Sequence, residues 1–275
     1  MTVSKSMIIW QADFYKHLSQ EHENNTKWNL IVCDQQGVII HQASCQQSEA
    51  TSNWLISELE PLVKQYSPDI IKVFRPQCLS LFALVGKRLE IKIEGTRRTP
   101  QLKQILQEKY PNSVKLEQSP PQAIPESLWG DKWHFATFKA GDFFDYFSDR
   151  PIPMKELPEA LNPIHLGIAS DVNIPGVVIY GGRQSMYLAR WLADNQPVSL
   201  NYIPTEVNKS GGLILESGLV DRWVLLTFEN AEMSQSAQQY EKQKERTQGL
   251  HFFLLQPDDS GMTQTGIWLL KKEKN

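Results

Sequence analysis

The sequence predicts an α/β protein made of two α/β domains. Short apolar runs alternate with helical patterns over residues 8–110. A proline-rich stretch without periodicity, residues 111–129, then interrupts the pattern, as a linker does. A second alternation of strand and helix patterns follows and runs to the end of the chain. We therefore expect one domain at residues 1–118 and another at residues 119–275.

The first half carries three strand patterns and then alternates helix and strand. The clearest helix start is Thr99-Pro100, where threonine suits the cap and proline the first helical position. Thr51 is the expected cap of an earlier helix that Pro61 should kink. The expected elements are strands at 7–14, 28–33 and 38–44, a helix at 54–66, a strand at 70–74, a helix at 78–89, a strand at 91–94 and a helix at 100–110.

This order of elements is also the order in ribonuclease H-like domains, so a metal-dependent nuclease must be considered. Such enzymes hold two metal ions between carboxylates on the first strand, the first helix and a central parallel strand. Asp13 would supply the first carboxylate, and Glu58 or Glu60 the second. The central strand carries no acid and ends in Arg75. We therefore expect a ribonuclease H-like core without a complete catalytic set.

The second half mixes strands, turns and two helices. Aromatic residues at 143–147 suit a core, with a base-stacking platform as the alternative. Residues 151–175 hold five prolines and are expected to be irregular. The expected elements are strands at 133–138 and 177–180, a helix at 183–193, strands at 198–203, 212–216 and 222–228 with a turn at 209–212, a helix at 230–246, and strands at 250–256 and 267–270.

A strand, a Gly181-Gly182 turn and a helix start form the most suggestive local site. Free N–H groups at a helix start favour an anion. Cations and aromatic residues then recur along one side of the helix, which suits phosphates and bases; an ordinary amphipathic helix is the alternative. The members of this stripe are Arg183, Tyr187, Arg190, Trp191 and Asp194.

Two other basic sites are candidates. Arg97 and Arg98 precede the Thr99 cap, where they would help to bind a phosphate or simply lie in solvent. At the end of the chain, Trp268 precedes Lys271 and Lys272. This arrangement fits a stacking surface with neighbouring cations, or an ordinary closing strand.

Composition narrows the function classes. The 275 residues carry 28 Lys+Arg against 31 Asp+Glu, a net charge of −3, which excludes a strongly basic nucleic-acid binder but permits a local basic patch. Three cysteines without a CxxC pair and six scattered histidines predict no metal site, and no cofactor is expected. No apolar run of about 18 residues exists, so no membrane insertion is expected.

Other enzyme motifs are weak or missing. Glu216 and Asp221 faintly suggest a restriction-type metal site, but no acid-x-lysine pair accompanies them. The chain lacks P-loop spacing, a GxGxxG fingerprint and a GxSxG elbow. We therefore predict a protein that is not an enzyme.

Four tryptophan-containing motifs are spread over nearly the full chain: residues 9–15 (IWQADFY), Trp28 with Cys33-Asp34, Trp129-Gly130 with Trp133, and the closing Trp268-Leu269-Leu270. In these motifs the chain resembles the Tab-type RNA-binding translation factors of chloroplasts and cyanobacteria. The resemblance implies binding of A/U-rich single-stranded mRNA leaders, contact of Trp268-Leu269-Leu270 with RNA, and support for translation of photosystem I reaction-centre messages and for photosystem biogenesis. Because no import leader is recognisable at residues 1–10, the resemblance implies a cyanobacterial, cytoplasmic member.

Three hypotheses follow. The first is an RNA-binding protein whose site draws on the C-terminal residues 268–272, the 183–190 stripe and Arg97-Arg98, with translation or photosystem assembly factors as further partners. The second is a metal-dependent nuclease of ribonuclease H-like or restriction-like type. The third is a scaffold that binds assembly factors.

Overall fold

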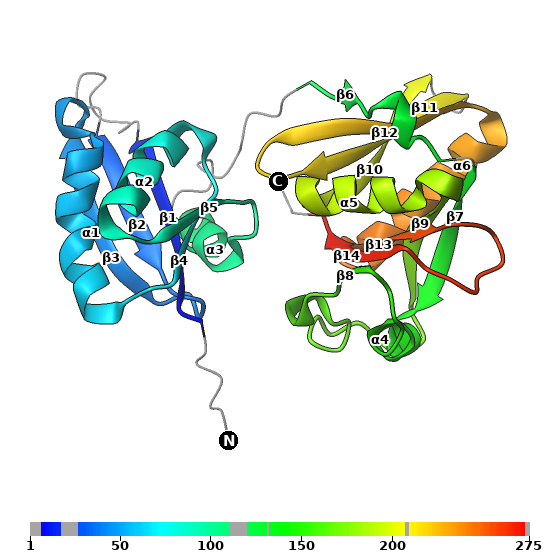
Figure 1. The fold of residues 1–275 in the computed structure, drawn as a ribbon, viewed down its shortest axis with the longest axis horizontal. Helices are drawn as coiled ribbons and strands as arrows, with labels where there is room; N and C mark the ends of the chain where they lie inside the picture. The colour runs from blue at the N-terminus through cyan, green and yellow to red at the C-terminus, as the bar shows by residue number, and fades with distance from the viewer. Residues whose placement is uncertain (1–6, 18–26, 110–119, 131, 207–208, 273–275) are drawn as a thin grey trace. The chain divides into compact units, whose positions relative to one another are not determined.

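The computed structural model describes residues 7–17, 27–109, 120–130, 132–206 and 209–272. The chain forms two compact units, Met1–Glu117 and Gln118–Asn275, which are described one at a time. Both units mix helices and strands, which confirms the predicted α/β class (Figure 1). No helix in the described ranges is long and apolar enough to cross a membrane.

The first unit is built on one five-stranded sheet with the order β3-β2-β1-β4-β5. β1, β2 and β3 are antiparallel neighbours, whereas β4 and β5 run parallel to β1. Parallel strands need crossover connections, which α1 and α2 provide. The bounds are β1 Ile9–His17, β2 Lys27–Cys33, β3 Ile39–Gln46, η1 Gln47–Glu49, α1 Ser52–Tyr66, β4 Ile70–Val73, α2 Pro76–Leu89, β5 Lys92–Gly95 and α3 Pro100–Lys109.

Of the two threonines expected to cap helices in this unit, one does so. Thr51 Oγ1 accepts a hydrogen bond from the Trp54 N–H at 3.3 Å and so caps α1, which continues through Pro61. The Thr99 hydroxyl is buried and has no hydrogen-bond partner in the described part of the chain. Instead, Gln11 Oε1 on β1 accepts from the Leu102 N–H at 3.1 Å, so a residue distant in sequence satisfies the start of α3.

The second unit contains two sheets. One has the order β10-β11-β12-β6 and the other β7-β9-β13-β14-β8. The bounds are β6 Gln122–Ala123, η2 Glu126–Leu128, β7 Lys132–Lys139, α4 Ala140–Ser148, β8 Met154–Glu156, η3 Glu159–Leu161, β9 Asn173–Tyr180, η4 Gly182–Gln184, α5 Ser185–Asn195, β10 Pro197–Glu206, β11 Ser210–Ser217, β12 Asp221–Glu229, α6 Ala231–Arg246, β13 Leu250–Gln256 and β14 Gly266–Lys271.

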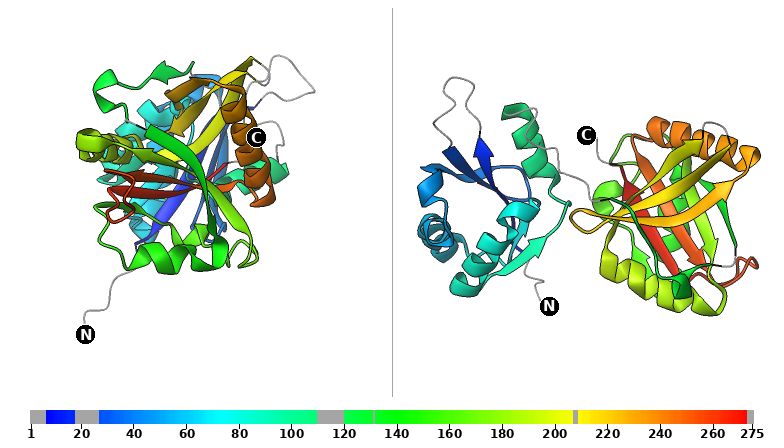
Figure 2. Two further views of the ribbon diagram at one scale, coloured as in Figure 1. Left: turned by 90° about the vertical axis from the view of Figure 1, so that its right-hand side faces the viewer. Right: turned by 90° about the horizontal axis from the view of Figure 1, so that it is seen from above.

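The five-stranded sheet of this unit is covered on both faces, and α4 and α5 lie on opposite faces of it (Figures 1 and 2). Phe143 and Phe147 of α4 are buried on one face and Phe144 packs partly buried beside them, which confirms the core interpretation for these three residues, whereas Tyr146 is 37% exposed. Side chains of α5, α6 and the four-stranded sheet pack on the other face. β14 alternates between the two cores, because Ile267 and Leu269 face the first and Trp268 and Leu270 the second.

Two expectations for this unit are wrong. Residues 151–175 are not wholly irregular, because β8 lies among them and pairs with β14 from Gly266↔Met154 to Trp268↔Glu156. Residues 209–212 are not simply a turn, because Ser210 begins β11. The cross-strand pairing of β8 means that β14 is an inner strand with a neighbour on each side.

Candidate nucleic-acid interface

The indole of Trp268 lies in the core of the second unit. Its exposed fraction is 1%, and its ring centroid lies 5.9 Å from that of Phe253. A Cβ on Gly266 would lie 2.4 Å from the indole, so glycine leaves the space that the ring occupies. Leu269 and Leu270 are also buried. The interpretation of Trp268 as an exposed stacking surface is therefore wrong. Because β14 is an inner strand with a core on each face, all three side chains are buried although they alternate in direction.

The two lysines after this tripeptide reach solvent. Lys271 is half-buried at the last position of β14 and Lys272 is exposed just beyond it. The Lys272 ammonium lies 3.5 Å from Glu241 Oε2 on α6. Of the predicted C-terminal RNA contacts, only these cations are accessible to a ligand.

Glu241 is part of a buried polar network. Lys244 is 1% exposed, and its Nζ donates to Leu200 O at 2.7 Å, Asn201 Oδ1 at 2.9 Å and Glu241 Oε1 at 2.7 Å. These three acceptors use all three donors of an ammonium group. The network ties α6 to β10 and also holds the carboxylate that faces Lys272. No local pattern predicts this network, since Lys244 lies on a largely polar helix.

The free energy of unfolding should depend on pH because this lysine is buried. Burial lowers the pKa of Lys244 from 10.5 to about 8, although Glu241 opposes the shift. Above pH 8 the unfolded chain binds more protons than the folded protein, so the free energy of unfolding should rise with pH, by about 1 kcal/mol between pH 8 and 9. Urea unfolding at both pH values checks this, with Lys244→Met as the variant that removes the rise. An equal slope in wild type and variant would assign the effect to other groups.

The glycine turn before α5 does not offer a free anion cradle. The N–H groups of Gly181 and Gly182 donate to Gln256 O at 2.9 Å and Pro257 O at 3.0 Å. The Gln184 N–H donates to Gly181 O, and the Ser185 N–H donates to Gly182 O. Neighbouring carbonyls therefore already accept from these four N–H groups, which favours an ordinary strand-to-helix turn over an anion-binding site.

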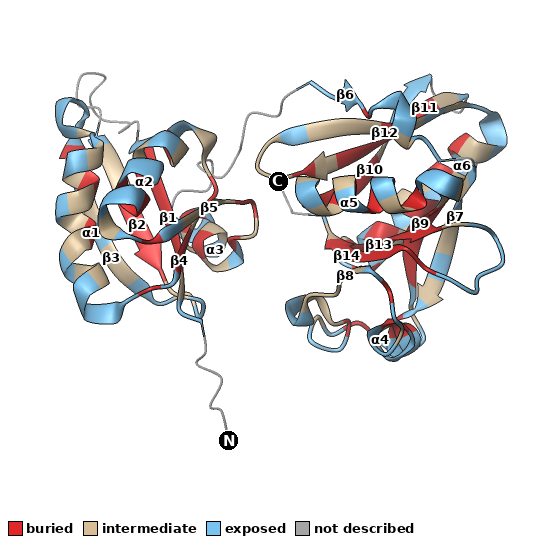
Figure 3. Ribbon diagram, viewed as in Figure 1, coloured by how far each residue is buried: buried red, intermediate tan, exposed pale blue. Residues whose placement is uncertain are grey.

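The outer face of η4 and α5, by contrast, keeps most of the predicted stripe. Arg183 and Arg190 are exposed, and Tyr187 between them is 62% exposed. Figure 3 shows that α5 has both exposed and buried positions. Neither arginine side chain makes a hydrogen bond or ion pair with another described residue. Trp191 leaves the stripe, because its ring packs edge-on against Trp223 at 5.1 Å. What remains is two cations with an aromatic ring between them on successive helical turns, followed one turn later by the exposed Asp194.

The predicted pair Arg97 and Arg98 is less exposed to solvent than a phosphate site at the surface would be. Arg97 is buried and Arg98 is half-buried. Lys103 Nζ donates to the Arg97 carbonyl at 2.7 Å, and the Arg98 N–H donates to Thr96 Oγ1 at 3.2 Å. Arg97 is thus part of the interior of the first unit, and only Arg98 approaches the surface.

Each acid of the nuclease hypothesis contacts a basic side chain. Arg75 Nε donates to Asp13 Oδ1 at 2.8 Å and Oδ2 at 2.9 Å, and the guanidinium lies 5.1 Å from the ring centroid of Tyr15. Burial raises the pKa of Asp13 to about 6, against the lowering effect of Arg75. Glu58 contacts His41 at 2.8 Å, and Glu60 pairs with Lys64. In the described part of the chain, no group of three or more His, Cys, Asp or Glu residues could hold a metal ion.

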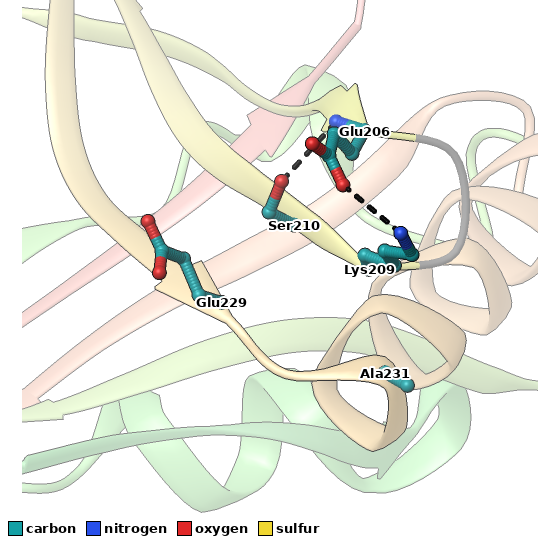
Figure 4. A pocket seen from close by; sticks show the side chains of 5 residues that line it. All are labelled: Glu206, Lys209, Ser210, Glu229 and Ala231. Carbon is teal, nitrogen blue, oxygen red and sulfur yellow. Dashed lines mark hydrogen bonds and ion pairs between the residues drawn. The ribbon is translucent and has the colours of Figure 1, made fainter.

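One open hollow of about 420 Å³ lies in the second unit, where β10, β11, β12 and the start of α6 meet. Figure 4 shows Glu206 held by Ser210 and Lys209, with Glu229 pointing away from them. Two carboxylates and one lysine make this hollow unsuited to a nucleic-acid backbone. The α5 face is therefore the better candidate in this unit.

Comparisons with known proteins agree with an RNA-binding role. Residues 9–109 match the family described as RNA-binding protein Tab2/Atab2 N terminal, and residues 111–271 match RNA-binding protein Tab2/Atab2, C-terminal domain. The chain is 26% identical over 292 residues to a protein TAB2 homolog, chloroplastic, of Arabidopsis thaliana, with 96% of this chain and 75% of the relative covered. A protein of the same name from Zea mays is 24% identical over 296 residues, covering 97% and 72%.

Solved structures give only weak likenesses. A chain of a simian T-cell lymphotropic virus intasome in complex with PP2A regulatory subunit B56 gamma aligns at a TM-score of 0.26 and 14% identity, covering 46% of this chain and 64% of that one. LC11-RNase H1 in complex with an RNA/DNA hybrid aligns at 0.18 and 16% identity, covering 37% and 75%. Scores this low carry no argument. The family matches cover both units almost completely, and the chain belongs to the Tab2/Atab2 family of RNA-binding proteins.

Proposed function

We propose that this protein binds A/U-rich single-stranded RNA through the outer face of α5 and does not cleave it. The observation that carries the proposal is the exposed series Arg183, Tyr187 and Arg190 in a member of an RNA-binding family. Guanidinium groups bind phosphates through paired N–H donors. A tyrosine ring between them offers a stacking surface for an unpaired base.

The charge of the chain limits how the RNA is held. With a net charge of −3, long-range attraction is weak and affinity depends on a local patch, so binding should fall steeply with salt. Lys271 and Lys272 add two cations at the end of β14, with Glu241 beside Lys272. We assign them an auxiliary role, since that carboxylate offsets part of their charge.

The biological target in this proposal is the leader of a photosystem I reaction-centre message, whose translation the protein supports. The resemblance to Tab-type factors and the name TAB2 homolog, chloroplastic, of the plant relatives support this choice. Sequencing of RNA crosslinked to the native protein tests it. Recovery of assembly factors without RNA would favour a scaffold instead.

We further propose that the first unit is a ribonuclease H-like core that has lost catalysis. The strand order β3-β2-β1-β4-β5 and the crossover helices support the fold. The Asp13–Arg75 contact supports the loss of catalysis, because a guanidinium takes the position where a metal ion would meet the first carboxylate. Incubation of labelled RNA and DNA with Mg²⁺ or Mn²⁺ should give no cleavage; cleavage that disappears in Asp13→Asn would restore the nuclease hypothesis.

The α5 face is tested with matched charge changes. The double variant Arg183→Ala/Arg190→Ala should weaken binding of A/U-rich single-stranded RNA roughly tenfold or more. Loss of two phosphate contacts should also make the slope of log affinity against log salt shallower by about 1.4. Titration at several salt concentrations measures both quantities.

Lys242→Ala/Arg246→Ala is the control, because both side chains are exposed on α6 and the net charge changes equally. Its affinity and salt slope should stay closer to wild type than those of the α5 variant. Equal losses in the two variants would mean that net charge, and not the α5 face, governs binding.

A further inference from the structure

Trp129 is an exposed aromatic residue that packing does not explain. It follows η2, and 58% of it is exposed, although tryptophan is usually largely buried. In a member of an RNA-binding family, such an exposed indole is suited to stack on a base, since every base has a flat apolar face.

The position of Trp129 is fixed by both sequence neighbours. Leu128 packs against the core cluster that contains Leu188 of α5, and η2 contacts α5 directly. On the other side, a Cβ on Gly130 would lie 2.5 Å from Ile179 Cγ2 and 3.0 Å from Tyr180 O. The chain therefore passes close to the end of β9 here, and the side chain of Trp129 beside it is exposed at the surface.

This placement brings Trp129 to the start of the α5 face. β9 ends at Tyr180, the residue that Gly130 abuts, and Arg183 follows three positions later. Tyr187 lies one helical turn further along. The end of β9 therefore lies next to Trp129 through the contact with Gly130. It is also close in sequence to Arg183 and Tyr187.

We propose that Trp129 is a second base-stacking residue, which with Tyr187 takes unpaired nucleotides of a single RNA strand while Arg183 and Arg190 contact the phosphates. This inference rests on the proposed RNA-binding function and specifies its ligand. Two stacking rings require bases that are free on at least one face, so a fully paired duplex is excluded from this surface. A protein partner would not need the neighbouring arginines, and the charge therefore favours RNA.

The test compares Trp129→Ala, Trp129→Phe and the control Ile164→Ala. Ile164 is 74% exposed in the same unit, so its removal also deletes an exposed apolar side chain. The probes are an A/U-rich single-stranded RNA of about 12 nucleotides and the same sequence as a duplex. Trp129→Ala should bind the single strand roughly 5- to 150-fold more weakly, while Trp129→Phe keeps most of the affinity. Ile164→Ala should match wild type, and duplex binding should not respond to Trp129.

The outcomes separate this inference from the proposed function. Unchanged single-strand affinity in Trp129→Ala, with unchanged melting and with the Arg183→Ala/Arg190→Ala loss present, would overturn the role of Trp129 alone. A wild-type protein that binds no RNA would overturn both proposals. Equal loss of single-strand and duplex binding in Trp129→Ala would also overturn the stacking role.

Discussion

Replacing Trp268 with alanine is expected to lower the free energy of unfolding by about 3–5 kcal/mol, because the indole fills the core between β14 and Phe253. This is a large fraction of the roughly 5–15 kcal/mol by which a typical domain is stable. Urea unfolding of the purified variant measures the change. RNA binding, measured where the variant is still folded, should stay within about threefold of wild type, which is under 0.7 kcal/mol.

Trp129→Ala is the matched control, since it makes the same substitution at an exposed tryptophan. The two variants should separate stability from binding: the buried position lowers stability, and the exposed one lowers RNA affinity. A Trp268→Ala protein with wild-type stability and lost RNA binding would show that the terminal tryptophan is a contact residue after all.

Replacing Asp13 with alanine is expected to destabilise the first unit by about 3–5 kcal/mol. The substitution removes the carboxylate from a guanidinium that is only 14% exposed. Thermal and urea unfolding give the size of the effect. Glu60→Ala is the control acid, and it should leave melting unchanged, because the Glu60–Lys64 pair lies at the surface.

The double variant Asp13→Ala/Arg75→Met shows whether the stability of the first unit depends on the ion pair or on the acid alone. Burial raises the pKa of Asp13 to about 6, so the charged carboxylate is tolerated in the interior chiefly with its partner. Removing both charges should therefore be less damaging than Asp13→Ala alone. A double variant as unstable as the sum of the single variants would contradict coupling between the two groups.

Much of the fold follows from local patterns. The alternation of strands and helices, the Thr51 cap and the aromatic core around Phe143 and Phe147 all depend on neighbours within a few residues, which the sequence displays. The site was harder to predict, because exposure depends on distant partners. β8 covers the edge of β14 and comes from a proline-rich stretch without strand periodicity, so nothing near Trp268 indicated that it would be an inner strand.

Two other differences have the same origin. Thr99 has the right residue type and position for a cap, but the Gln11 amide from β1 takes that role across 91 residues of sequence. The sequence shows that the strand before Arg75 lacks a catalytic acid, whereas the contact of Arg75 with Asp13 depends on the parallel pairing of β1 and β4. For Trp129, the glycine that follows it was the available signal, since Gly130 marks a close backbone approach.

RNA is proposed to lie on the outer face of α5 and not on the terminal tripeptide. Ultraviolet crosslinking of an A/U-rich single-stranded RNA to the full chain, with the linked residues identified by mass spectrometry, tests it most directly. Crosslinks are expected at Tyr187 and Trp129, and none is expected at Trp268. Crosslinks at Trp268, or crosslinks confined to the first unit, would contradict it.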